Sequence, residues 1–319
     1  MKLVTIDAGI AGAPGAILRS GEILHLARAA LPGSLEAWLP GSLREILAAG
    51  EAGLAIVRQI VQRVEAMEHT PRERLRAAGT LTGAATPLLA PIPRPGLVLA
   101  AGLAYRSHLA EMAGTPAPPH PTGFLKSPHS IAAPDTPVIL PPDADRQVDY
   151  EGELAVVFGR TCHGVTAQTA LDYVGGYTVA NDLSARDWVR AVWEAREPWQ
   201  ARTAWEVNIM GKQFDGFTPL GPALVTSDEI PDPALLQLTT RLNGEVMQQA
   251  SVSDLIFDVA HTIAHFARWY TFEPGDVLLT GTPAGVGVGR KPPVFLRDGD
   301  VVDVTVTGIG HLRSTVCRA

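Results

Sequence analysis

The amino-acid sequence predicts an α+β, β-rich fold in which mixed sheets roll into a barrel-like arrangement, preceded by a small N-terminal α/β domain. Short apolar runs separated by Pro and Gly turns dominate the chain after residue 96, and few segments have helical periodicity. Many short strands with few helices are typical of stacked or rolled sheets. With 319 residues, 46% of them hydrophobic, the chain is long enough to bury one large core or two modest ones.

The N-terminal domain is expected to span residues 1–75. Short strands at its start precede a helix that the residues around Ser42 indicate. Ser42 and Glu45 have the spacing of a capping box. From Leu43 to Val64 apolar side chains recur at helical intervals, so we expect one helix that packs against the rest of the domain.

Residues 76–96 are rich in Pro, Gly and Thr and are expected to form a linker, after which a larger C-terminal domain spans residues 97–319. Its strands are expected at residues 97–101, 138–140, 153–158, 176–181, 223–226, 236–242, 276–280 and 301–306, and its main helices at 166–173 and 257–269. Asn243-Gly244 lies between two of these strands and predicts a type I′ hairpin.

Composition excludes several classes of protein. The net charge is -7 and the basic residues are scattered, which argues against nucleic acid as a partner. No window reaches the roughly 18 uncharged apolar residues of a membrane span, and the N-terminus lacks the apolar core of a signal peptide. The only cysteines, Cys162 and Cys317, are far apart. These features predict a cytoplasmic protein without structural disulfides.

Two carboxylates open the apolar run that begins near residue 153. Glu151 and Glu153 are two residues apart, so on a strand they project to the same side. A third acid, Asp182, follows another apolar strand. Oxygen ligands without nearby cysteine suit Mg²⁺, Mn²⁺ or Ca²⁺ better than zinc. The alternative for the pair alone is the solvent face of a half-exposed hairpin.

A His-x-x-Glu motif lies upstream of these acids. On a helical turn His108 and Glu111 share one face, so the carboxylate can orient the imidazole and raise its basicity toward water. The alternative is a surface ion pair, worth roughly a few tenths of a kcal/mol.

Three further motifs have both a structural and a functional interpretation. A helix is predicted to begin shortly after Asp182, and Ser184 could cap it. Arg186, in the same segment, either pairs with an acid or binds substrate. Lys212, amid Gly and Pro, is either solvated or an electrostatic clamp on a carboxylate or enolate. Thr282 lies in a glycine-rich loop that either forms a tight turn or grips a substrate carboxylate.

The order of these motifs resembles that of the fumarylacetoacetate hydrolase family, C-terminal catalytic domain type. They read His-x-x-Glu, Asp-Tyr-Glu-x-Glu-Leu, Asn-Asp-x-Ser-Ala-Arg-Asp, Gly-Lys-x-Phe-Asp and Thr-Gly-Thr-Pro-x-Gly-Val, and the match runs from about Pro91 to the C-terminus. The resemblance implies the rolled-sheet catalytic fold of that family, usually a homodimer, and a divalent cation, Mg²⁺ first, with Mn²⁺ or Ca²⁺ as alternatives.

The resemblance also assigns roles to individual residues. It implies metal ligands at Glu151, Glu153 and Asp182, catalytic residues at His108, Glu111 and Lys212, and substrate contacts at Lys126 and Thr282. Tyr105 and Arg186, which lie beside these motifs in the sequence, are further candidates for substrate contact. The sequence departs from the family pattern at Val189, where many relatives have a glutamine that touches the substrate. Nearby Trp193, Trp199 and Gln200 are candidates to refill the space.

The residues suit chemistry on a small-molecule 2-oxo acid. Our first prediction is a hydrolase that cleaves a C–C bond of an acylpyruvate or related β-diketo acid, with water activated by the His-Glu dyad. The alternatives are a decarboxylase, isomerase or hydratase of a 2-oxo or 2-hydroxydienoic acid from aromatic catabolism, since these reactions share an enolate. A non-catalytic relative that kept only the fold is a further alternative.

Overall fold

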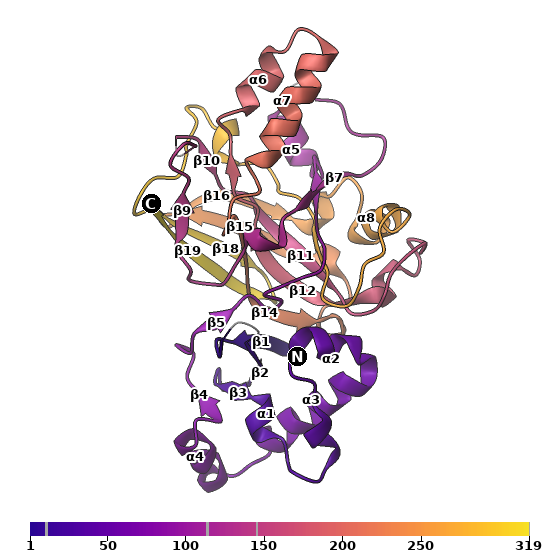
Figure 1. Cartoon of the computed structure of the whole chain (residues 1–319), viewed down its shortest axis with the longest axis vertical. Coiled ribbons are helices and arrows are strands. Elements are labelled where there is room, and N and C mark those ends of the chain that lie inside the picture. The colour runs from indigo at the N-terminus through magenta and orange to yellow at the C-terminus, as the bar shows by residue number, and fades with distance from the viewer. Residues whose placement is uncertain (10–11, 113–114, 145, 319) are drawn as a thin grey trace.

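The structure is a computed structural model that describes residues 1–9, 12–112, 115–144 and 146–318. It is α+β and rich in strands, as the sequence predicts. In Figure 1 the N-terminal strands and helices form the lower part of the molecule, and the larger group of sheets lies above them.

Among the described residues, twelve strands form one long sheet. They are β1 (Lys2–Ile6), β2 (Ala13–Ile17), β3 (Ile23–His25), β4 (Leu81–Thr82), β5 (Leu88–Leu89), β6 (Val98–Gly102), β7 (Thr122–Lys126), β8 (Ile131–Ala132), β11 (Gly152–Phe158), β12 (Val174–Asn181), β14 (Thr218–Thr226) and β17 (Val277–Leu279). The N-terminal strands join the others where β1 pairs antiparallel with β14. The two parts of the molecule therefore share one continuous sheet.

Two smaller sheets complete the strand pairing of the described chain. The first has five strands, β9 (Val138–Leu140), β15 (Gln237–Leu242), β16 (Glu245–Ser251), β18 (Val301–Val306) and β19 (Gly310–Arg318), and the second pairs β10 (Val148–Asp149) with β13 (Ser184–Ala185). Side chains of β11 and β12 pack with those of β15 and β18 in the main hydrophobic core. The pairing found in the described residues is open at the sheet ends, so barrel-like closure remains a prediction.

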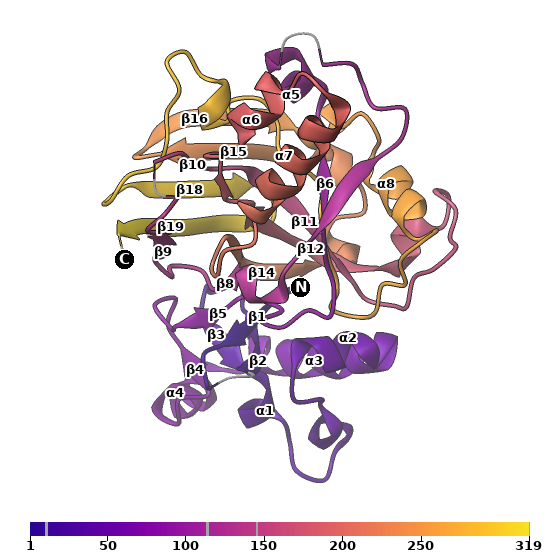
Figure 2. The same ribbon diagram turned by 45° about the horizontal axis from the view of Figure 1, so that its top comes forward.

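The helices lie around these sheets. They are α1 (Leu26–Ala29), α2 (Leu43–Ala48), α3 (Gly50–Glu65), α4 (His69–Ala77), α5 (Arg106–Glu111), α6 (Val189–Glu194), α7 (Pro198–Met210) and α8 (Val259–Phe266). Viewed from the second direction in Figure 2, α5, α6 and α7 gather at the end of the molecule away from α1 to α4.

Three local predictions can be compared directly with the structure. The Ser42 hydroxyl accepts the backbone N–H of Glu45 at 3.2 Å, which confirms the cap. The predicted single helix is wrong, because α2 ends before Ala49 and α3 begins at Gly50, whose φ of 61° breaks the helical backbone. Asn243 and Gly244 both have positive φ, as a type I′ hairpin requires.

Three other segments differ from the sequence-based expectation. The expected helix at 166–173 is reduced to a 3₁₀ turn at Ala170–Tyr173. Ser184 lies in β13 and donates to the carbonyl of Asp182 at 2.9 Å, so it caps no helix, and the next helix begins at Val189. The segment 76–96, expected to be a linker, contributes β4 and β5, which pair with β3 and β1.

Candidate active site

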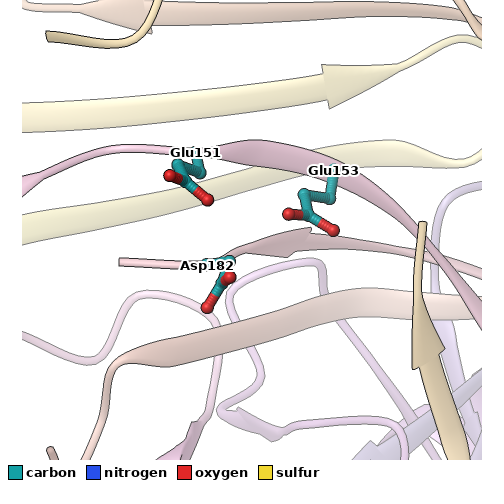
Figure 3. A group of neighbouring side chains, drawn as sticks. All are labelled: Glu151, Glu153 and Asp182. Atoms are coloured by element: carbon teal, nitrogen blue, oxygen red, sulfur yellow. The ribbon is translucent and has the colours of Figure 1, made fainter. Parts of the chain in front are cut away.

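The three predicted metal ligands converge at one end of two paired strands. Gly152 of β11 lies opposite Asn181 of β12, and the antiparallel register brings the flanking acids together. The backbone N–H of Asp182 donates to the carbonyl of Glu151 at 2.8 Å. Ligand oxygens of Glu151, Glu153 and Asp182 all lie within 4.8 Å of one another, and the three side chains are buried (Figure 3). We call this group the acid cluster.

The chemistry of the acid cluster fits a divalent cation. Glu153 accepts the N–H of Gly281 at 2.7 Å but forms no ion pair with a described Lys, Arg or His side chain. Burial, together with the charges of Asp182 and Glu151, raises the pKa of Glu153 well above its usual value. Such a buried group of oxygen ligands without cysteine is what Mg²⁺, Mn²⁺ or Ca²⁺ binds.

Two lysines contact the acid cluster from separate elements. Lys212, after α7, donates to Glu151 and to Asp182, each at 2.7 Å. Burial lowers the pKa of Lys212, but Asp182 and Glu151 outweigh it, and the net pKa is raised. Lys126 of β7 pairs with Asp182 on its other oxygen, and burial lowers the pKa of this lysine despite that pair. The sequence alternative of a solvated Lys212 is therefore wrong.

Arg186 is held between two acids. Its guanidinium pairs with Glu151 and, at 3.3 Å, with Asp149. Burial favours a higher pKa for Glu151, yet Lys212 and Arg186 prevail and lower it to about 2. Asp149 also accepts the N–H groups of Gly287 at 2.6 Å and of Val288 at 3.1 Å. No role of Asp149 was predicted from the sequence, although this residue is the first of the Asp-Tyr-Glu-x-Glu-Leu motif.

The predicted dyad forms on α5. Nδ1 of His108 lies 3.2 Å from Oε2 of Glu111, and the backbone N–H of Gly285 donates to the other carboxylate oxygen of Glu111 at 3.0 Å. Both side chains are mostly buried and face the cavity described below. The pair is therefore not the exposed surface ion pair that the sequence left as an alternative.

Thr282 connects the glycine-rich loop to β11. Its hydroxyl donates to the carbonyl of Gly152 at 3.0 Å and accepts from the side-chain amide of Gln248 at 2.8 Å. The Gln248 amide oxygen in turn accepts the N–H of Gly152 at 3.0 Å. Gln248 was not predicted from the sequence, because it belongs to none of the motifs recognised there. Thr282 is also one of the residues that line the cavity.

Two residues expected to contact substrate lie elsewhere. Tyr105 is fully buried in the main core and does not line the cavity; it forms an isolated bridge with Leu255 instead. Lys126 is also buried away from the cavity wall, where it contacts Asp182. The structure thus brings Lys126 to the site as a partner of Asp182, a predicted metal ligand.

One cavity of about 590 Å³ opens onto these groups. Its lining includes His108, Glu111, Glu151, Asp182, Arg186, Lys212 and Thr282, together with Phe124, Val189, Trp193, Trp205, Asn208 and Ile209. Of the three residues proposed to refill the space near Val189, Trp193 reaches the cavity, whereas Trp199 and Gln200 do not line it.

The comparisons with known proteins agree with this geometry. Residues 97–317 match the family model described as Fumarylacetoacetate (FAA) hydrolase C-terminal. The chain belongs to the fumarylacetoacetate hydrolase family. Bovine mitochondrial oxaloacetate tautomerase FAHD2A is 37% identical over 319 residues, which cover 99% of this chain and 91% of that protein. The family resemblance inferred from the motifs is confirmed.

Solved structures show the same fold. Fumarylacetoacetate hydrolase from Exiguobacterium antarcticum has a TM-score of 0.75 and 33% identity, with all of both chains covered. Maleylpyruvate hydrolase from Sphingobium sp. SYK-6, solved with manganese(II) and pyruvate, has a TM-score of 0.71 and 26% identity, again over all of both chains. The chain is thus similar both to tautomerases and to hydrolases of the family. Within its described part, no helix is long and apolar enough to cross a membrane.

Proposed function

We propose that this fumarylacetoacetate hydrolase family enzyme is a divalent-metal-dependent hydrolase of acylpyruvates. The observation that carries the proposal is the position of the His108–Glu111 dyad on the same cavity as the acid cluster. A group that can activate water and a group that can hold a cation thus reach one bound substrate.

The residues divide the chemistry as follows. A divalent cation held by Glu151, Glu153 and Asp182 would supply Lewis acidity toward the carboxylate and keto oxygens of a 2-oxo acid. Lys212 adds a positive charge beside that position. The free ring nitrogen of His108 takes the proton of a water molecule, while Glu111 stabilises the resulting imidazolium.

Bond making and breaking then balance without an additional reactant. The water oxygen bonds to the distal acyl carbon, and the bond between this carbon and the methylene carbon breaks. The electron pair of that bond goes to pyruvate, which leaves as its enolate and takes up a proton. The products are a carboxylic acid and pyruvate.

A second candidate is tautomerisation of a 2-oxo acid between its enol and keto forms. The bovine relative, an oxaloacetate tautomerase by name, favours it. This reaction needs the same enolate stabilisation and a proton carrier, but no attack by water on a carbon atom. Decarboxylation, hydration and the non-catalytic alternative have no comparable support.

One experiment separates these reactions. The full chain is incubated with Mg²⁺ or Mn²⁺ and acetylpyruvate, and pyruvate is measured by coupling to lactate dehydrogenase. We expect pyruvate to form, and the activity to disappear with EDTA. Faster loss of the oxaloacetate enol absorbance, without pyruvate from acetylpyruvate, supports the tautomerase instead. Failure of both reactions in the metal-loaded protein contradicts the proposal.

Three further proposals concern the bound ion, the assembly and the location of the protein. We propose Mg²⁺ as the resident ion, a homodimer as the assembly and the cytoplasm as the location. Analytical ultracentrifugation tests the dimer, and metal analysis of protein purified without chelators tests the ion. A monomer at micromolar concentration contradicts the homodimer, and a different metal bound in stoichiometric amount contradicts Mg²⁺.

A further inference from the structure

The cavity has a second, apolar part that the proposed chemistry does not use. Val189 and Trp193 of α6 lie four residues apart, as do Trp205 and Ile209 of α7, and all four line the cavity. Residues four apart share one face of a helix. Each helix of the α6–α7 hairpin therefore presents an apolar pair to the cavity that also contains the dyad. We call these four residues the apolar wall.

The tryptophans of the apolar wall are not buried by the rest of the chain. Trp193 is 63% exposed and Trp205 is 45% exposed, although both are large and apolar. The α6–α7 hairpin projects at the upper end of the molecule in Figure 1, beside α5, which carries the dyad. An apolar group bound between them would remove indole surface from water, which is favourable in proportion to the area covered.

The charges along the cavity point to the same kind of ligand. Among the described lining residues, the Lys and Arg side chains are Arg186 and Lys212. Arg186 pairs with Glu151 and Asp149, and Lys212 pairs with Glu151 and Asp182. Both cations are therefore already paired with acids of the acid cluster or with Asp149. The described lining offers no unpaired Lys or Arg for a second carboxylate at the distal end of a substrate.

From these observations we infer that the apolar wall is a subsite for an aromatic acyl group. The preferred substrates are then aroylpyruvates, 2,4-dioxo acids with an aryl group on the distal carbonyl, and not dicarboxylates such as oxaloacetate. This inference rests on the proposed function, because it assigns the distal half of the same substrate. Continuity of the wall with the catalytic cavity selects this occupant over a separate ligand.

The test compares three substrates in the metal-loaded full chain: benzoylpyruvate, acetylpyruvate and oxaloacetate. A single methylene in an apolar pocket changes kcat/KM by about 10- to 200-fold. We therefore expect kcat/KM for benzoylpyruvate to exceed that for acetylpyruvate by at least about 10-fold. Equal values for the two acylpyruvates, or a preference for oxaloacetate, overturn the inference.

Substitutions of Trp205 test whether the apolar wall causes the preference for benzoylpyruvate. Trp205→Ala is expected to lower kcat/KM for benzoylpyruvate about 10-fold more than it lowers kcat/KM for acetylpyruvate, mainly through KM. Trp205→Phe should retain most of the preference. Trp199→Ala is the matched control, because Trp199 lies on α7 but off the cavity, with Arg202 stacked on its ring at 5.3 Å. Equal losses on both acylpyruvates in Trp205→Ala contradict the subsite.

Binding measurements keep this test independent of the reaction. If no 2-oxo acid is turned over, the proposed function fails, but calorimetric titration with benzoylpyruvate and acetylpyruvate still tests the apolar wall. We expect benzoylpyruvate to bind at least about 10-fold more tightly, and Trp205→Ala to remove that difference. Equal affinities in the unmodified protein overturn the subsite even when the enzyme is active.

Discussion

Charged side chains are arranged differently in the N-terminal part of the molecule and around the acid cluster. In the N-terminal part, Glu22 pairs with Arg72 and Arg76 of α4 at 2.8 and 2.6 Å, close to water. Around the acid cluster, four acids and three bases are buried, namely Asp149, Glu151, Glu153, Asp182, Lys126, Arg186 and Lys212. Ion pairs near water need little desolvation. For buried ion pairs, the free energy lost on desolvating the charges offsets much of the free energy gained from their attraction.

The contrast separates two uses of charge in one chain. The pairs of Glu22 secure α4 against the N-terminal sheet and contact no catalytic group. Four of the buried charged residues, Glu151, Asp182, Arg186 and Lys212, line the cavity. Replacing such buried ion pairs with well-packed apolar side chains of similar volume is often neutral or stabilising. Stability alone therefore does not account for these buried charges, whereas the proposed metal-dependent chemistry would use them.

The largest expected effect comes from Asp182→Asn. This change removes a proposed metal ligand and the shared partner of Lys126 and Lys212. Loss of groups that merely orient a metal ligand costs about 10- to 100-fold, so we expect kcat to fall by at least about 100-fold and Mn²⁺ affinity to drop. Turnover of acetylpyruvate and calorimetric titration with Mn²⁺ measure both. Full activity in this variant would remove the metal from the mechanism.

His108→Ala tests the dyad separately from the metal. We expect kcat for hydrolysis to fall about 100-fold or more, the usual cost of losing a general base, with Mn²⁺ affinity unchanged. The matched control is His311→Ala, since His311 also pairs with an acid, Asp303 at 2.7 Å, but its side chain on β19 is 52% exposed. Unchanged turnover in His108→Ala would instead favour a reaction that needs only enolate stabilisation.

The N-terminal counterpart is Glu22→Gln. We expect it to lower the free energy of unfolding by about 1 kcal/mol, because two charged hydrogen bonds to α4 weaken, and to leave kcat unchanged. Urea titration measures the first and acetylpyruvate turnover the second. Glu51→Gln is the control, since the carboxylate of Glu51 is 76% exposed and its pair with Arg58 should contribute only a few tenths of a kcal/mol. A loss of activity in Glu22→Gln would contradict the separation of the two regions.

The smallest effect is the pH dependence of that same pair. The hydrogen bond from Arg76 is the main cause that lowers the pKa of Glu22 from 4.5 to about 2. A lowered folded-state pKa stabilises the protein above the unfolded value and loses this contribution as the pH falls toward the folded value. The difference in unfolding free energy between wild type and Glu22→Gln should therefore shrink as the pH falls from about 5 toward about 2. Urea titrations across this range measure it, and a constant difference contradicts it.

Patterns that depend on neighbouring residues predicted the structure well. The Ser42 cap and the Asn243-Gly244 turn formed as expected, because both depend on a few consecutive backbone conformations. The break at Gly50 was missed, since apolar periodicity continues across it while the backbone does not. The strand β13 replaced an expected helix start at Ser184 because pairing with β10 outweighs local preference.

Local chain geometry was enough to predict that Glu151 and Glu153 project together and that His108 reaches Glu111, since these pairs are two and three residues apart. The partners of the acids were not predictable in this way. Lys126 lies 56 residues from Asp182 in the sequence, so only the tertiary structure brings these two side chains together.

The same reason explains the apolar wall. The α6 and α7 sequences contain the tryptophans, but only the packing of the two helices beside the cavity decides that Trp193 and Trp205 face it while Trp199 does not. Motif order was thus sufficient to predict the family, and the three acids converge as predicted. Which cations neutralise those acids, and which side chains surround the distal end of a substrate, depended on contacts between elements far apart in the chain, which no local periodicity encodes.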